Sequence, residues 1–69
     1  LPTGITSILL HGNNLPIANV NTILIALDTA GQINGTVNVS SQTPAAPPSG
    51  AGITAANNLI GKGWTVFTD

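Results

Sequence analysis

The apolar residues of this chain follow two different periods along its length. In three stretches, residues 6–10, 36–40 and 64–68, apolar and polar positions alternate and β-branched residues are frequent. Alternation with a period of two is typical of a strand with one buried face. We therefore predict three strands, whose inward side chains are Ile8, Leu10, Val37, Val39, Trp64 and Val66.

A helical period occurs between the first two strands. Residues 17–30 follow Pro16 and precede Gly31, and their apolar side chains recur at i, i+3, i+4 and i+7, namely Val20, Ile23, Leu24 and Leu27. Pro is well tolerated near a helix start, and Gly suits the left-handed position that follows a helix end. The pattern predicts a helix over residues 17–30.

A second helix is predicted over residues 50–62. Ser49 is its expected N-cap, and Gly63 is the expected left-handed residue after its end. The expected apolar face consists of Ile53, Ala56, Leu59 and Ile60. Before this helix, residues 41–49 contain three prolines and therefore predict a loop.

The order strand, helix, strand, helix, strand predicts an α/β fold. Inward residues recur after 37 − 8 = 29 and 64 − 37 = 27 positions, so one strand and one helix form a unit of about 28 residues. Right-handed crossovers then give a parallel sheet with residues 6–10 and 64–68 at its edges and both helices on one face. This spacing puts Ile8, Val37 and Trp64 in one inward column and Leu10, Val39 and Val66 in the next. On the open face it aligns Leu9, Asn38 and Thr65 in one row and His11, Ser40 and Phe67 in the next.

Residues 5–15 resemble a leucine-rich repeat. The pattern L-x-x-L-x-L-x-x-N-x-L is carried by Ile5, Ile8, Leu10, Asn13 and Leu15. The Asn13 side chain is expected to hydrogen-bond backbone groups where the chain turns. The second unit departs from the pattern, because Gln42 and the proline-rich loop stand where the asparagine and the following leucine belong. The resemblance implies one solenoid domain of about two and a half repeats over residues 1–69.

Residues 50–66 look like the closing repeat of bacterial and phage leucine-rich-repeat proteins. Those proteins often end in a similar Lys-Gly-Trp-Thr-Val run, which is present here as residues 62–66. The family implies surface, virion or adhesive roles without a shared chemistry. An extracellular, cell-surface or virion location is therefore expected.

Charge is scarce. Asp28, Lys62 and Asp69 make up 4% of the chain, against roughly 25% in an ordinary soluble domain, so little repulsion opposes self-association. A single basic residue excludes nucleic-acid binding by phosphate neutralisation, and it equally excludes a polybasic membrane patch. No apolar run approaches the roughly 18 residues of a membrane span. The chain begins with Leu1 rather than Met, and we expect a processed product or a piece of a longer polypeptide.

The inventory for catalysis is nearly empty. His11 is the only histidine, and a triad or metal site would require Asp28 or Asp69 to approach it across the fold. We expect His11 to lie half exposed at the end of the first strand instead. The run Gly61-Lys62-Gly63 superficially resembles a phosphate loop, but it falls at a predicted helix C-terminus, where the dipole repels anions. We predict no enzymatic activity, no cofactor and no metal; Cys is also absent, which excludes disulfides and thiolate metal sites.

Two Asn-x-Ser/Thr triplets make glycans candidate partners. Asn34 precedes a turn-forming Gly and is the better acceptor, whereas Asn38 falls in the middle of a predicted strand. Thr43 lies in a loop of Pro, Ser and Thr, a composition typical of O-glycosylated stretches, although a plain solvated loop has the same composition.

Three hypotheses of function follow. The first is a non-enzymatic structural protein that assembles with itself, head to tail, into a filament or ring, because both edge strands lack the usual protection against pairing. Its expected contact residues are Ile8, Leu9, Leu10, Trp64, Val66 and Phe67. The second is the C-terminal cap of a longer leucine-rich-repeat ligand-binding or adhesion protein. The third, an enzyme, has no nameable substrate.

Overall fold

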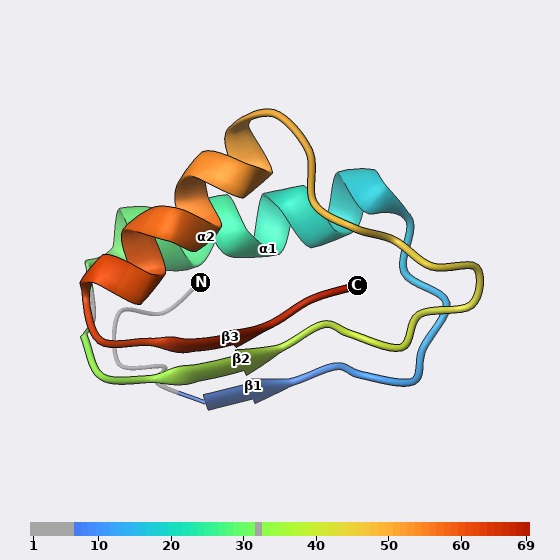
Figure 1. The fold of residues 1–69 in the computed structure, drawn as a ribbon, viewed down its shortest axis with the longest axis horizontal. Coiled ribbons are helices and arrows are strands. Elements are labelled where there is room, and N and C mark those ends of the chain that lie inside the picture. Colours follow the sequence, from blue (N-terminus) through green and yellow to red (C-terminus); the bar gives the residue numbers. More distant parts are fainter. Residues whose placement is uncertain (1–6, 32) are drawn as a thin grey trace.

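The structure is a computed structural model that describes residues 7–31 and 33–69. The elements follow in the order β1 (Ser7–Leu9), α1 (Ile17–Ala30), β2 (Thr36–Asn38), α2 (Ala51–Gly61) and β3 (Thr65–Phe67). The strands form a parallel sheet in the order β1-β2-β3, and both helices cover one of its faces (Figure 1). The predicted α/β architecture is confirmed, as are the bounds of α1. The strands are shorter than predicted, and Ile5 and Thr6 lie outside the described residues.

The pairing register repeats with one constant offset in residue number. Ser7 pairs with Thr36 and Thr36 pairs with Thr65, so the offset from β1 to β2 equals the offset from β2 to β3, 36 − 7 = 65 − 36. The expected alignment of Trp64 with the inward column of Ile8 was wrong by two residues. The inward column is Ile8, Val37 and Val66, and the adjacent outward row is Leu9, Asn38 and Phe67.

The shift arises at the end of α2, where Trp64 belongs to the helix terminus and not to the strand. Gly63 adopts a φ of 86°, its N–H donates to the Ile60 carbonyl at 3.1 Å, and the Trp64 N–H donates to the Leu59 carbonyl at 3.0 Å. This pair of bonds is the Schellman arrangement of a helix C-terminus. Trp64 therefore completes the helix, and β3 begins one residue later. The predicted role of Gly63 is confirmed.

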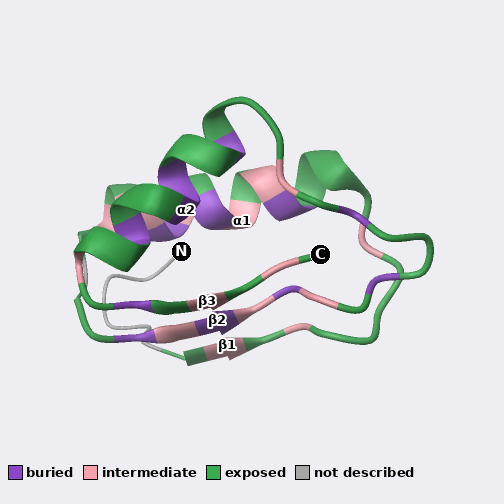
Figure 2. Cartoon of the chain, in the orientation of Figure 1, coloured by how far each residue is buried: buried purple, intermediate pink, exposed green. Residues whose placement is uncertain are grey.

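The core lies between the helix layer and the sheet, with β2 at its centre (Figure 2). Val37 of the middle strand and Val39, which follows that strand directly, are fully buried. The fully buried side chains of α1 and α2 include Val20, Leu24, Leu27 and Leu59. Ile23, predicted on the inner face of α1, is half-buried against this cluster.

The predicted inner face of α2 was partly wrong. Gly52 and Ala55 are buried, whereas Ile53 and Ile60 are 48% and 57% exposed. Small residues let the two helices approach closely, since a Cβ on Gly52 would lie 3.1 Å from the Asn21 Cα of α1. The helix is therefore rotated to present its small residues, and the two isoleucines face away from the core.

The helix termini also differ in part from expectation. Gly31 is left-handed after α1, with a φ of 77°, as predicted. Ser49 is not the N-cap of α2, which is Gly50, and no side chain caps this end. The Ser49 hydroxyl instead accepts a hydrogen bond from Asn21 Nδ2 at 3.2 Å, and the Ser49 N–H donates to Asn21 Oδ1 at 3.0 Å. This reciprocal pair joins the loop before α2 to α1.

Candidate functional site

The two edges of the sheet are less covered than its centre. Val37 is fully buried, while its partners in the same column, Ile8 on β1 and Val66 on β3, are only half-buried. All three side chains point toward the helix layer and pack on the same core. Their difference arises because the middle strand has a neighbour on both sides and each edge strand has one.

Both edges direct backbone groups outward. The Leu10 N–H donates to the Asn38 carbonyl at 2.8 Å, and the Val39 N–H donates to the Phe67 carbonyl at 2.9 Å. Successive residues of a strand direct their N–H and C=O groups to opposite sides. The backbone groups of Leu9 on β1 and of Val66 on β3 therefore point away from the sheet, and among residues 7–31 and 33–69 no further strand pairs with them.

The open face of the sheet carries two large apolar side chains. Leu9 is 61% exposed and Phe67 is 48% exposed, and they occupy the same row on opposite sides of Asn38. The sequence predicted both as exposed but in different rows. Leu10, predicted as a contact residue, is half-buried and turned toward the core. Trp64, also predicted as a contact residue, is 4% exposed and belongs to the core.

A buried glutamine joins the turns that follow β1 and β2. Gln42 is 5% exposed; its Oε1 accepts the Leu15 N–H at 2.9 Å, and its Nε2 donates to the carbonyls of Leu10 at 2.9 Å and Val39 at 3.2 Å. Asn13, as predicted, donates from Nδ2 to the Leu10 carbonyl at 2.8 Å. Gln42 follows Asn13 by the same offset that relates the paired strands, and it likewise bonds the carbonyl three residues before itself. The sequence pattern alone did not predict this role of Gln42, although the spacing of the first two strands was its signal.

Asp69 binds the proline-rich loop. Its carboxylate accepts the backbone N–H groups of Ser41 at 2.6 Å, Ala46 at 3.0 Å and Gln42 at 3.1 Å. The hydrogen bond from Ala46 is the main cause that lowers the pKa of Asp69 below its ordinary 3.8, against a smaller opposing effect of desolvation. This contact fixes the loop over residues 41–46 to the end of β3.

The remaining two charges pair with each other between the helices. Lys62 Nζ lies 2.6 Å from Asp28 Oδ1 and donates to the Asp28 carbonyl at 2.9 Å, while Asn58 Nδ2 donates to Asp28 Oδ2 at 3.0 Å. The hydrogen bond from Lys62 lowers the pKa of Asp28, and the bond from Asn58 adds to it. The only basic side chain of the chain is thus engaged at the α1–α2 contact.

The residues considered for catalysis do not form a triad. His11 is exposed, rather than half exposed, and its side chain has no hydrogen bond within the described part of the chain. The Ser40 hydroxyl donates to Asn38 Oδ1 at 2.6 Å, and the Asp69 carboxylate faces the loop amides. Within residues 7–31 and 33–69, no three His, Cys, Asp or Glu side chains gather in a way that would hold a metal ion. In this same part, no helix has the length and apolarity required to cross a membrane.

The candidate glycan acceptors differ in accessibility. Asn34 and Thr43 are exposed, and Asn34 adopts a left-handed φ of 60° at the predicted turn. Asn38 is half-buried, and its side-chain oxygen is engaged by the Ser40 backbone and hydroxyl. Asn34 is therefore the more accessible of the two asparagines, and glycosylation at either position stays a prediction.

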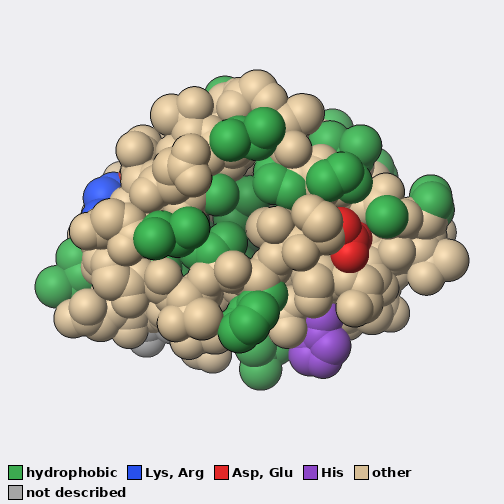
Figure 3. All heavy atoms as spheres, in the orientation of Figure 1, with side chains coloured by type: hydrophobic (Ala, Val, Ile, Leu, Met, Phe, Trp, Pro, Cys, Tyr) green, Lys and Arg blue, Asp and Glu red, His purple; other side chains and the backbone are tan. Residues whose placement is uncertain are grey.

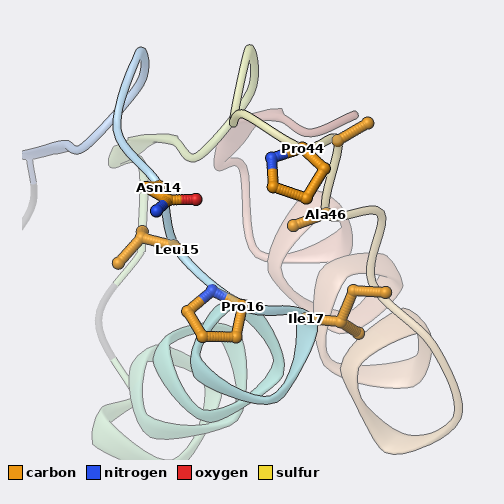
Figure 4. Close-up of a pocket in the computed structure, with 7 residues that line it drawn as sticks. Asn14, Leu15, Pro16, Ile17, Pro44 and Ala46 are labelled. Carbon is orange, nitrogen blue, oxygen red and sulfur yellow. The ribbon is translucent and has the colours of Figure 1, made fainter.

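A pocket of about 390 Å³ lies between the loop before α1 and the proline-rich loop (Figure 4). Its walls include the rings of Pro16 and Pro44 and the side chains of Leu15 and Ile17. No titratable side chain lines it. The pocket offers an apolar depression without groups for acid–base chemistry.

Apolar side chains are spread over the outer surface as well. Figure 3 shows hydrophobic side chains over the helix layer and over the sheet, with more of them visible between the two layers. Ile53 and Ile60 contribute to the exposed apolar surface of α2, and Leu9 and Phe67 to that of the sheet.

Comparisons with protein-family models, with curated proteins and with solved structures found no match to this chain.

Proposed function

We propose that this chain is a non-enzymatic structural protein, a leucine-rich-repeat-like solenoid of about two and a half repeats that assembles with itself head to tail. In the assembly, β1 of one copy pairs with β3 of the preceding copy and continues the parallel sheet. An extracellular, cell-surface or virion location is part of the proposal. Its support comes from the edges of the sheet and from the scarcity of charge.

The observation that carries the proposal is the constant offset between paired strands. Continuing this offset beyond β3 aligns Ile8 of the next copy with Val66 and Leu9 of the next copy with Phe67. The backbone groups of Leu9 and Val66 that point away from the sheet then meet each other. The half-buried Ile8 and Val66 each gain the second neighbour that Val37 already has.

The same alignment pairs the exposed side chains of the open face. Phe67 of one copy lies beside Leu9 of the next, so that two large apolar side chains cover each other. Mutual burial of two apolar side chains removes apolar surface from water, which stabilises the junction. Little charge opposes the contact, because Asp28 and Lys62 pair within the copy and Asp69 is the one further carboxylate of the chain.

The test is the oligomeric state of purified protein, measured by light scattering after size exclusion and by electron microscopy. Leu9 is the position of choice, because Ile8 and Leu10 pack on the core and their substitution threatens folding. Leu9→Glu or Phe67→Lys alone is expected to reduce assembly at least tenfold, and Leu9→Glu/Phe67→Lys in one chain to restore it through an ion pair at every junction. Thr43→Lys, on the exposed proline-rich loop and outside the proposed strand contact, is the control. A wild-type monomer at micromolar concentration contradicts the proposal.

The alternative is that this chain forms the C-terminal cap of a longer leucine-rich-repeat protein that binds a ligand or acts in adhesion. The contact of Asp69 with three loop amides favours the cap. The carboxylate of Asp69 accepts backbone N–H groups of the proline-rich loop, so these groups need no partner from a following repeat. In that case a preceding repeat of the same polypeptide covers β1. The mass of the intact polypeptide isolated from its source distinguishes the two, since sequence before Leu1 supports the cap.

A further inference from the structure

The helix layer contains two flanks of different chemistry. On α1, Asn21 and Asp28 make the side-chain contacts to α2 and to the loop before it. The inner faces of the two helices superpose when Val20, Leu24 and Leu27 are matched in order with Gly52, Ala56 and Leu59. The same shift along the chain takes Asn21 to Ile53 and Asp28 to Ile60. These two isoleucines form the outer flank of α2, on the side that a following helix would contact.

The opposite flank belongs to α1. Asp28 is contacted by the side chains of Asn58 on α2 and of Lys62 at the C-cap of that helix. The reverse of that shift takes them back to Ala26 and Ala30, which are half-buried. Ala26 and Ala30 form the outer flank of α1, on the side that a preceding helix would contact. The outer flank of α2 therefore carries large apolar side chains, and the outer flank of α1 carries small ones.

The widths of the sheet and of the helix layer determine whether the two flanks of adjacent copies meet in the proposed assembly. Three strands at about 4.8 Å occupy about 14 Å along the stack, and two helices at about 8–10 Å occupy about 16–20 Å. A third helix between β3 and the next β1 would extend the helix layer to about 24–30 Å and force strong curvature. A copy with three strands and two helices leaves no width for an intervening helix, so the helices of adjacent copies touch when their strands pair.

We infer that, in the head-to-tail assembly, α2 of one copy packs on α1 of the next through Ile60 against Ala26 and Ala30, and through Ile53. The partner of this flank is a second copy of this chain. This inference rests on the proposed function and adds a helix-layer contact to the strand contact. The arrangement repeats the α1–α2 contact within a copy, with Ile60 in place of Asp28 and the two alanines in place of Asn58 and Lys62. Both flanks are uncharged, so neither desolvation of an ion nor repulsion opposes the contact.

Cysteine cross-linking tests the contact, because the native chain contains no Cys. Ile60→Cys/Ala26→Cys is treated with a short thiol-reactive cross-linker under assembling conditions and compared with Ile60→Cys/Thr43→Cys, whose second cysteine lies on the exposed proline-rich loop, outside the helix layer. We expect a ladder of covalent multimers from the first pair, with at least tenfold more product than from the second. Addition of Leu9→Glu, which breaks the strand contact, should remove the ladder.

The failure of this inference is distinguishable from failure of the proposed function. If the protein assembles but both pairs cross-link equally little, strand stacking stands and the helix contact is overturned. If neither wild type nor variants assemble, the proposed function itself is overturned. Ile60→Lys provides a second readout: its side chain is exposed within one copy, so folding should persist while the concentration required for assembly rises at least tenfold.

Discussion

Leu9 and Phe67 are each the register partner of Asn38, one on either side, in a single row of the open sheet face. They are also the two large apolar side chains exposed on the described strands. In the proposed assembly, the apolar ends of this row meet those of neighbouring copies and gain burial there. This relationship underlies the proposed assembly, and it depends on the fold that holds the three strands in register.

Gln42 is expected to be the most sensitive polar position. Gln42→Glu removes the donor to the Leu10 and Val39 carbonyls and places a carboxylate beside them. Because a buried unsatisfied or charged group is costly, the free energy of unfolding should fall by about 3 kcal/mol or more at pH 7. Urea denaturation measures it. Asn57→Asp, a matched amide-to-acid change at an exposed position, should change the free energy by no more than about 0.5 kcal/mol. Equal effects of the two changes would refute a special role for Gln42.

The fold should lose stability in acid because its two carboxylates, Asp28 and Asp69, become protonated. Folding lowers the pKa of Asp28 and of Asp69 below 3.8, so the folded state favours their ionised forms. The resulting stabilisation is present above the ordinary pKa and is lost as pH falls through the lowered values. Asp28 and Asp69 are the only carboxyl side chains of the chain. Urea midpoints from pH 7 to 2 should therefore fall less steeply in Asp28→Asn and in Asp69→Asn than in wild type. An unchanged pH profile in both variants would exclude these carboxylates as its origin.

The close contact of the helices predicts opposite effects at two glycines of α2. Alanine normally stabilises a helix by about 1 kcal/mol relative to glycine. At Gly52 the added Cβ would clash with Asn21, so Gly52→Ala should instead destabilise the fold by about 1–3 kcal/mol. At Gly61 nothing lies within 4 Å of the added Cβ, and Gly61→Ala should be neutral or stabilising. Thermal unfolding followed by circular dichroism measures both. Stabilisation by Gly52→Ala would show that the helices are less close than the structure has them.

The sequence predicted the local elements well because local signals define them. The spacing of Val20, Leu24 and Leu27 between Pro16 and Gly31 fixes α1, and the alternation around Val37 fixes β2. The register of β3 was less accessible. The tryptophan has the character of a strand residue, and only the hydrogen bond from its N–H to the Leu59 carbonyl assigns it to the helix end.

Tertiary contacts also determine which face of α2 is buried. The hydrophobicity of Ile53 and Ile60 indicated an inner face, but the close approach of Gly52 to Asn21 rotates the helix away from it. The role of Gln42 depends on groups in another turn, which no local pattern contains. Of the predicted contact residues, Leu9 and Phe67 are exposed and retained, whereas Trp64 lies in the core.

Strand stacking at a constant register is the central claim, and the axial rise per copy in assembled material tests it most directly. Cryo-electron microscopy of filaments or rings should give a spacing of about 14 Å between successive copies, three strands at about 4.8 Å each, with the strands crossing the stacking direction. Leu9→Glu should abolish this material. A protein that remains monomeric at micromolar concentration, or an assembly whose copies are not spaced by about three strand widths, would contradict the account.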